Sequence, residues 1–528
     1  MNPSEQSYSQ TEKRIVRERI ISGSVTALTT ERASSPVVPT EVFLKTLDYA
    51  SSFLAEHSGT FVGGDLKPHV LDWLALHASR IGTRKPSELQ VLFLAGPDPT
   101  NDLIEFRKCG VAYENIWAIE SDKNTFGLAV KALEGQGIRV KLHRGNLHSF
   151  FSLVPQQFDI VYFDATAPLF GGEPNTFNVI RELVLNQRLT PLSVLVTNFA
   201  EANKDGKSAE VWKKRLGTWA YANGTIDTWK ETFQEFADDQ VMPQIPQAYG
   251  EFITKFLVRF CSQLVPWWRV VALPGAKREY FSDEAKLGKA AQSAAGTVEM
   301  FGHPLYPLFR TVLFASEFLD EGDMMSRLLF KEKLENAKLA DAVKFVSLIR
   351  TFYEQHFDGV FCSTKHILDA CSPEFARALN SFQWFDQRHR IFCDTPLPNL
   401  IADLLLGLYG FPYHTNVQKL QRFAYKAKET VMFTDIMVLD QARYMYDLLP
   451  TLPLFDMKFS LSQQLVLRAC MDSLHRHCHY GCKDLFWGCA LAGMGEDGFT
   501  FWLPPVRESV GCPGVTFQAP DADGRETC

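Results

Sequence analysis

Residues 90–102 read QVLFLAGPDPTND, and this stretch decides the fold class. Gln90 is followed by an uninterrupted apolar run, which is typical of a β-strand that is buried on both faces. A glycine, two prolines and several residue types that favour helix starts come next, so a helix is expected at 101–109. The stretch therefore predicts a strand, a turn and a helix in direct succession.

The same alternation of strand and helix patterns continues to residue 199. Apolar runs typical of strands recur at 115–119, 139–143, 158–163 and 193–199, and helical spacing separates them, clearest at 122–135 and 176–186. Strands that alternate with helices favour a parallel sheet covered on both faces. The sequence therefore predicts an α/β fold with a Rossmann-like, doubly wound, mainly parallel sheet, followed by a mostly α-helical C-terminal domain.

The length of the chain allows about two to four domains. Residues 1–40 contain few large apolar side chains and are expected to form a mobile N-terminal arm, with a short helix near 12–21. The α/β domain is expected at 41–315, with late strands near 267–272 and 309–314. Helical spacing dominates afterwards, which predicts a helical domain at 316–512 and a mobile tail at 513–528. Helices of that domain are expected at 327–352, 373–382, 399–408, 416–430, 435–448 and 460–476.

Composition excludes several classes of protein. With 46% hydrophobic and 22% charged residues, the chain is neither collagen-like, nor wholly disordered, nor a disulfide-stapled mini-protein. Its net charge of −7 argues against a dedicated nucleic-acid coat or a polybasic membrane binder. No secretory signal and no apolar span of about 18 residues is visible, so we expect a cytoplasmic protein with reduced cysteines.

Polar residues follow four of the predicted strands, where open parallel sheets bind their ligands. Gly96 allows a ligand to approach the backbone closely, and Glu120 suits the hydroxyl groups of a ribose. Asn146 suits the edge of an adenine, and Asp164 stands where a reacting or orienting group is expected. Asp98 and Asn101 lie at a helix start, whose N–H groups favour anionic ligands.

This pattern resembles the class I S-adenosylmethionine-dependent methyltransferase superfamily over residues 88–200. Residues 91–102 take the place of its glycine-rich first motif, and Glu120 and Gly145-Asn146 match the ribose and adenine positions. Residues 158–170 match the fourth motif. The resemblance implies S-adenosylmethionine as cofactor, bound by Gly96, Asp98, Asn101, Glu120, Asn146 and Asp164. It also implies Asp164 and Pro168 as catalytic residues, with a nucleic-acid base or a small molecule as methyl acceptor.

Other interpretations of these residues stay open. Asp98, Asn101 and Asp164 are also common helix caps, and buried strands followed by Gly or Asp occur in many α/β folds. The first motif has a single glycine, which favours a non-catalytic, methyltransferase-like scaffold that acts through its helical half. An NAD-binding domain would require G-x-G-x-x-G after the first strand, and this motif is absent.

A Cys/His cluster lies near the C-terminus, where residues 470–489 read CMDSLHRHCHYGCKDLFWGC. On a helix, residues four positions apart share a face, so Cys478, Cys482, His475 and His479 form a candidate zinc site. The spacing matches no standard zinc finger. The alternative is that these cysteines belong to a helical core and the histidines to an exposed face.

Lys419, Arg422 and Lys426 form the clearest local basic pattern. Their spacing of three and four residues places them on one side of the expected helix at 416–430. Such a stripe leaves room for a nucleic-acid partner despite the acidic overall charge. The alternative is a solvated helix face without a partner.

Overall fold

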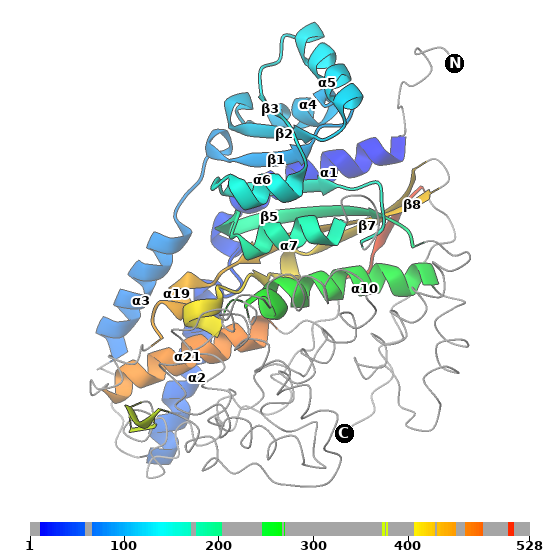
Figure 1. Cartoon of the computed structure of the whole chain (residues 1–528). Coiled ribbons are helices and arrows are strands. Elements are labelled where there is room, and N and C mark those ends of the chain that lie inside the picture. The colour runs from blue at the N-terminus through cyan, green and yellow to red at the C-terminus, as the bar shows by residue number, and fades with distance from the viewer. Residues whose placement is uncertain are drawn as a thin grey trace, which may run out of the picture.

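The computed structural model describes eleven stretches of the chain (Figure 1), namely 11–58, 66–169, 176–202, 245–266, 269, 372–374, 376–377, 406–427, 430–449, 460–478 and 505–511. The expected strand at 309–314, the expected helix at 327–352 and the expected tail at 513–528 lie outside these residues. So does the expected strand at 267–272, apart from Arg269.

Within the described residues, nine strands form one sheet in the order β3-β2-β1-β4-β5-β8-β7-β9, and β6 pairs with β8. Strands β1 to β5 are parallel, whereas β8 runs antiparallel to both β5 and β7. The order of the first five strands is that of a doubly wound sheet, so the predicted Rossmann-like α/β class is confirmed. The strands are β1 (Val91–Leu94), β2 (Ile116–Glu120), β3 (Lys141–Arg144), β4 (Phe158–Asp164), β5 (Leu189–Ala200), β6 (His414–Thr415), β7 (Gln421–Ala427), β8 (Thr430–Asp440) and β9 (Glu508–Val510).

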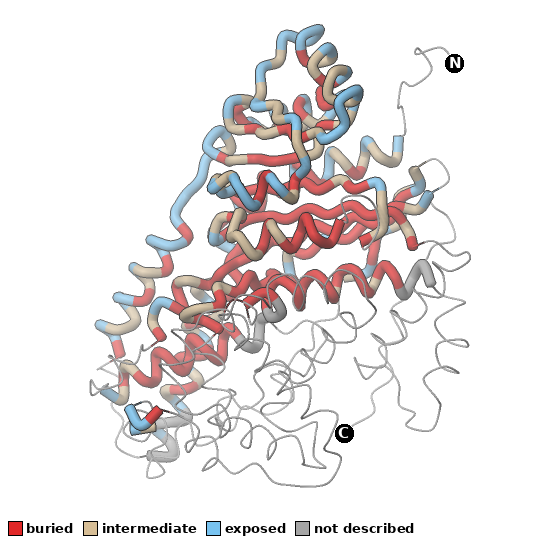
Figure 2. Tube along the Cα trace, viewed as in Figure 1, coloured by how far each residue is buried: buried red, intermediate tan, exposed pale blue. Residues whose placement is uncertain are grey.

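Helices cover both faces of this sheet, and each face has its own apolar core. Successive residues of β4 point to opposite cores, with Ile160 and Tyr162 in one and Val161 and Phe163 in the other. The first core holds side chains of α1 (Thr11–Leu28), α4 (Thr100–Lys108) and α5 (Lys123–Gly135). The second holds side chains of α6 (Leu147–Leu153), α7 (Thr176–Leu185) and α10 (Ile245–Arg259). Figure 2 shows the central strands buried along their length.

A group of helices lies beyond one end of the sheet (Figure 1). It consists of α2 (Thr40–Ser58), α3 (Leu66–Ile81), α19 (Arg443–Tyr446) and α21 (Leu461–Cys478). Trp73 of α3 is buried there and stacks on Phe43 of α2, with ring centroids 3.7 Å apart. Among the described helices, none combines the length and the apolar character that a membrane crossing requires.

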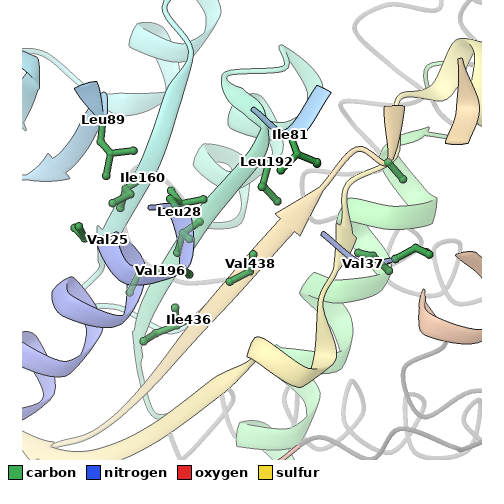
Figure 3. Packing of buried hydrophobic residues seen from close by; sticks show 14 of the residues in the cluster. Val25, Leu28, Val37, Ile81, Leu89, Ile160, Leu192, Val196, Ile436 and Val438 are labelled. Carbon is green, nitrogen blue, oxygen red and sulfur yellow. The ribbon is translucent and has the colours of Figure 1, made fainter. Parts of the chain in front are cut away.

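The expectation of a mobile arm over residues 1–40 needs correction for its described part. Thr11–Leu28 forms the helix α1, which extends the short helix expected near 12–21. Its few apolar residues recur at helical spacing, and Val16, Ile20, Val25 and Leu28 are all buried. Figure 3 shows Val25 and Leu28 among side chains of β4, β5 and β8. This helix therefore forms part of the first core.

The interpretation of 416–430 and 435–448 as helices is wrong. Most of these residues form β7, β8 and the short helix α19, and β8 pairs with β5 along nine residues. The sequence of β8, TVMFTDIMVLD, is nearly continuous in apolar and β-branched residues, as in a strand buried on both faces. The boundary at residue 315 therefore does not separate the sheet from a helical domain, since 421–440 completes the sheet.

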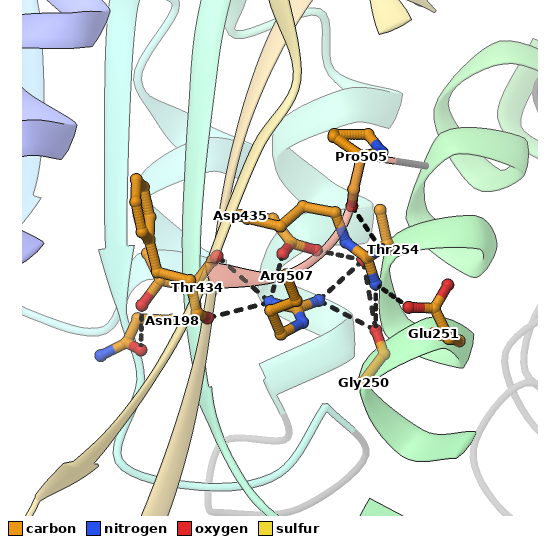
Figure 4. Close-up of polar contacts among 10 residues, drawn as sticks. Asn198, Gly250, Glu251, Thr254, Thr434, Asp435, Pro505 and Arg507 are labelled. Carbon is orange, nitrogen blue, oxygen red and sulfur yellow. Dashed lines mark hydrogen bonds and ion pairs between the residues drawn. The ribbon is translucent and has the colours of Figure 1, made fainter. Parts of the chain in front are cut away.

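The last described segment, 505–511, docks against the edge of the sheet as β9. Its Arg507 is buried, and Nη1 lies 2.6 Å from Asp435 Oδ1 of β8 (Figure 4). Nη2 of Arg507 donates to Gly250 O and Thr254 Oγ1 of α10, both at 2.9 Å. Arg507 therefore joins the last described segment to β8 by an ion pair and to α10 by hydrogen bonds.

Candidate functional site

The carboxyl ends of β1, β2, β4 and β5 lie along one edge of the sheet. The register pairs Leu94 with Ile119, and it pairs Asp164 directly with Asn198. After β1 the chain turns to β2 on one side, while β4 pairs with β1 on the other side. This is the switch point at which doubly wound sheets bind ligands. The predicted residues Gly96, Glu120 and Asp164 all follow or end these strands.

Gly96 begins the turn after β1 in a left-handed conformation, with φ of +61°. An added Cβ would meet nothing within 4 Å, so the space beside this backbone is open. A non-glycine residue would be strained here by its own backbone and not by a neighbour. The turn therefore has the open backbone that close approach of a ligand requires.

Asp98 and Asn101 contact each other at the start of α4. Asp98 Oδ1 accepts from Thr100 N at 3.1 Å, and Asp98 Oδ2 accepts from Asn101 Nδ2 at 3.1 Å. Asn146 lies at the start of α6, where its Oδ1 accepts from Ser149 N at 2.7 Å. Asp98 and Asn146 thus accept from backbone N–H groups at helix starts, whereas Asn101 donates its side-chain amide to Asp98. The cofactor roles of all three residues remain predictions.

Glu120 ends β2 and is half-buried. Its Oε1 accepts from Asp122 N at 2.8 Å, which holds the side chain at the strand end. Its backbone oxygen accepts from Gly145 N at 3.0 Å. This bond brings the Gly145-Asn146 turn beside Glu120, so the two positions that the sequence predicts for a nucleoside are adjacent.

Asp164 ends β4, and its side chain is 20% exposed. Oδ1 accepts from Asn198 Nδ2 at 2.5 Å, and Oδ2 accepts from Lys13 Nζ at 3.0 Å. Lys13 belongs to the first turn of α1, far away in the sequence. The carboxylate therefore has one partner from the sheet and one from the N-terminal helix.

A row of polar groups continues from Asp164 across the sheet. Asn198 pairs in register with Thr434 of β8, whose Oγ1 donates to Asn198 Oδ1 at 2.7 Å. Asn198 Nδ2 also donates to the hydroxyl of Tyr425 of β7 at 2.9 Å. Asn198, Thr434 and Tyr425 are all buried. Burial raises the pKa of the Tyr425 phenol, and the nearby Asp164 carboxylate adds to this effect, so the hydroxyl stays neutral.

A second acidic residue, Asp102 in the first turn of α4, lies on the same side of the sheet. Arg17 of α1 contacts it, with Nε 2.8 Å from Oδ1, and the Asp102 side chain is 13% exposed. Burial raises the pKa of Asp102 to about 6; the Arg17 guanidinium opposes this rise, and the Asp164 carboxylate adds to it. Lys13 and Arg17 are four positions apart, so one face of α1 supplies both cations.

Four residues of this site were not predicted from the sequence, namely Lys13, Arg17, Asp102 and Asn198. Signals for three of them were present: Lys13 and Arg17 form a basic pair with helical spacing, and Asn198 is one asparagine inside the apolar run SVLVTNFA. Neither signal predicts which residue the side chain contacts, because the contacts are long-range: 151 positions separate Lys13 from Asp164. Such contacts depend on the packing of α1 over the sheet.

Pro168 lies in the loop after β4 and is half-buried. Ala165 N donates to Asn198 O at 2.9 Å, and Ala200 N donates to Ala167 O at 3.2 Å, so the loop follows the end of β5. The carbonyl of Pro168 accepts from Thr176 Oγ1 at 2.7 Å. The loop is therefore held beside Asp164, although the catalytic role of Pro168 remains a prediction.

Lys419, Arg422 and Lys426 do not form the predicted helical stripe. Lys419 ends the 3-10 helix η13 (Val417–Lys419), whereas Arg422 and Lys426 belong to β7. Arg422 is buried, and its Nη2 lies 2.6 Å from Glu251 Oε1 of α10. The helical interpretation fails because residues 421–427 pair with β8. A nucleic-acid partner for this region stays an untested prediction.

The candidate zinc ligands fall at the edge of the described chain. His475 and Cys478 belong to the last turn of α21, while their side chains, like all of His479 and Cys482, lie outside the described residues. Among the side chains that are described, no group of three or more His, Cys, Asp or Glu could hold a metal ion. The zinc site therefore remains a prediction.

No family model and no curated protein matches this chain. Three similar solved structures carry methyltransferase names. The protein yhhF from Escherichia coli is 18% identical over 27% of this chain and 71% of its own, with a TM-score of 0.19. A Staphylococcus aureus protein named as a caffeoyl-CoA O-methyltransferase is 12% identical over 40% of this chain and 83% of its own, with a TM-score of 0.19. The plantazolicin methyltransferase BamL, in complex with a triazolic desmethylPZN analog and SAH, is 13% identical over 47% and 74%, with a TM-score of 0.20.

Proposed function

We propose that this chain is an S-adenosylmethionine-dependent methyltransferase in which Asp164 orients the acceptor nitrogen and takes its proton. The observation that carries the proposal is the position of two acidic strand ends, Glu120 and Asp164, on either side of the open Gly96 turn. In a doubly wound sheet this is the ligand-binding edge. The reversed strand β8 beside β5 is also a departure from an all-parallel NAD-binding sheet.

The residues at this edge fit the cofactor. The open backbone at Gly96 accommodates close approach, and the Glu120 carboxylate is suited to ribose hydroxyls. The Gly145-Asn146 turn beside Glu120 would contact the adenine. Arg17 and Asp102 offer one cation and one carboxyl near the start of α4, which suits the zwitterionic end of the cofactor. When bound, the cofactor supplies a methyl group on a sulfonium, so the protein mainly aligns the reactants.

The contact between Asp164 and Lys13 supports a nitrogen acceptor. Oδ2 of Asp164 already accepts from an N–H donor at 3.0 Å, so an acceptor amine can take the same position when Lys13 moves away. The carboxylate then orients the nitrogen lone pair and receives the proton that the nitrogen loses. The side chain is 20% exposed, which leaves it accessible to a substrate. A nucleic-acid base and a small-molecule amine both offer such a nitrogen.

A non-catalytic scaffold is the second candidate, and one observation favours it. Both oxygens of Asp164 have protein partners, Asn198 and Lys13, so the carboxylate is satisfied without a substrate. A scaffold of this kind would not need to bind the cofactor.

Calorimetric titration with S-adenosylhomocysteine separates the two candidates. We expect binding, weakened about tenfold or more by Glu120→Ala, because charge-assisted hydrogen bonds to the ribose are lost. Glu134→Ala, an exposed acid of α5, is the matched control and should leave the affinity unchanged. Absence of binding to the unaltered protein would refute the methyltransferase proposal. Transfer of a labelled methyl group to RNA, DNA or small amines would then identify the acceptor.

A further inference from the structure

We infer that Asn198 is a positioning residue for Asp164. It fixes Oδ1 of the carboxylate, so that Oδ2 is the oxygen presented to an incoming amine. This inference rests on the proposed function, because it assigns a role toward the same acceptor nitrogen.

Register places Asn198 directly beside Asp164. The two residues are partners on the parallel strands β4 and β5, and their side chains meet at 2.5 Å. Thr434 is the register partner of Asn198 on its other side, in β8. The three residues thus form one transverse row on the face of the sheet that α1 covers, and Figure 4 draws the Asn198–Thr434 end of this row.

The amide of Asn198 has only one orientation that satisfies its partners. Its Nδ2 donates to both Asp164 and the Tyr425 hydroxyl, and its Oδ1 accepts from Thr434. A flipped amide would bring its oxygen against the carboxylate of Asp164 and lose both donated bonds. Because a carboxylate can only accept, Asp164 determines that the Nδ2 group of Asn198 faces it, and the hydroxyl groups of Thr434 and Tyr425 complete the hydrogen bonds of the amide.

The two partners of Asp164 differ in how firmly they are held. Asn198, Thr434 and Tyr425 are 1%, 1% and 2% exposed, so water cannot replace their mutual hydrogen bonds. The Lys13 side chain is 27% exposed and reaches Asp164 from the first turn of α1. The bond to Asn198 is therefore fixed, whereas the bond to Lys13 is exchangeable.

The polar row also interrupts an apolar strand face. Val194 and Val196, which share the Asn198 face of β5, both belong to the first core. Apolar residues would fill the Asn198 and Thr434 positions without any need for partners. The row ends at the partly exposed Asp164, where a fixed amide holds Oδ1 and leaves Oδ2 for an incoming amine.

Paired titrations with S-adenosylhomocysteine and sinefungin test this role. Sinefungin carries an amine in place of the sulfonium methyl, so it probes the acceptor-facing oxygen of Asp164. In the unaltered protein we expect sinefungin to bind more tightly than S-adenosylhomocysteine. Asn198→Ala should weaken sinefungin about tenfold and leave the affinity for S-adenosylhomocysteine unchanged, since only the amine contact depends on the carboxylate geometry. Thr434→Val should reduce the ratio of sinefungin affinity to S-adenosylhomocysteine affinity by less, because it removes only one hydrogen-bond partner of Asn198.

Ser193→Ala is the control, since Ser193 is buried earlier in β5 and away from Asp164.

Two results for Asn198→Ala overturn the inference. One is that neither affinity changes. The other is an equal loss of affinity for both ligands, which indicates a purely structural role. If Asn198→Ala does not fold, Thr434→Val and Tyr425→Phe test the inference instead. In both variants the ratio of sinefungin affinity to S-adenosylhomocysteine affinity should fall, and an unchanged ratio overturns the inference. Failure of the unaltered protein to bind S-adenosylhomocysteine refutes the proposed function itself, which is a distinct result.

Discussion

Arg17 of α1 lies 2.8 Å from Asp102 of α4, and this ion pair joins the N-terminal helix to the first helix of the doubly wound unit. One turn earlier, Lys13 contacts Asp164. Two cations on one helix face therefore pair with two carboxyls, one at the end of β4 and one in the first turn of α4. The start of α1 is thus part of the candidate site as well as of the core.

The first prediction concerns the dependence of stability on pH. Burial raises the pKa of Asp102 to about 6 in the folded protein, against an ordinary value of 3.8. Between about pH 4 and pH 6 the unfolded chain therefore releases this proton before the folded protein does, and stability falls as the pH rises. The difference between these pKa values corresponds to about 3 kcal/mol.

Urea unfolding of the unaltered protein and of Asp102→Asn measures this effect across pH 4 to 7. The difference in unfolding free energy between the two should fall through this window and then level off. Arg17→Met should move the fall to higher pH, because Arg17 lowers the pKa of Asp102. A difference that stays constant with pH would contradict the prediction.

The second prediction concerns Lys13. Lys13→Met removes the cation that occupies Oδ2 of Asp164, so a ligand amine meets less competition there. We expect sinefungin to bind several-fold more tightly, with a loss of stability of at most about 1 kcal/mol, since the pair is partly exposed. Calorimetry and urea unfolding measure the two quantities. Arg14→Met, on the exposed side of the same turn, should change neither; weaker sinefungin binding by Lys13→Met would show that Lys13 assists the ligand.

The third prediction separates backbone strain from binding at Gly96. Gly96 and Gly137 have φ of +61° and +64°, and an added Cβ meets nothing within 4 Å at either position. Alanine should therefore cost about 1 kcal/mol of stability at each, from the left-handed conformation. Only Gly96→Ala should also weaken S-adenosylhomocysteine binding, since the Gly137 turn lies between α5 and β3, after the ribose position. Equal effects of both substitutions on binding would count against the Gly96 turn as a cofactor contact.

Local patterns in the sequence predicted the first half of the fold. The five apolar runs from 90 to 199 each correspond to a strand, since short buried strands are recognisable from their own residues. The end residues Gly96, Glu120 and Asp164 were predicted for the same reason: they follow from strand positions alone. By contrast, 421–427 (QRFAYKA) contains good helix formers, and only its pairing with β8 makes it a strand.

The rest of the candidate site depends on long-range packing. Lys13 meets Asp164 because the apolar stripe of α1 fits the sheet face formed by β4, β5 and β8, which the sequence of α1 does not specify. Asn198 gains its role from Thr434 and Tyr425, more than two hundred positions away. These contacts exist only after β7 and β8 have joined the sheet.

The last prediction concerns Arg507, which holds the C-terminal segment in place. Arg507 and Asp435 are both fully buried, and no water can replace the guanidinium if it is removed. Arg507→Met should therefore destabilise the protein by about 3–5 kcal/mol, because it leaves the Asp435 carboxylate without its cation. Glu508→Gln, next in the same segment, removes only an exposed pair with Arg19 and should cost less than about 1 kcal/mol. Urea unfolding of both variants, with limited proteolysis to follow release of β9, measures the contrast. Equal, small effects would mean that the segment contributes little to the stability of the sheet.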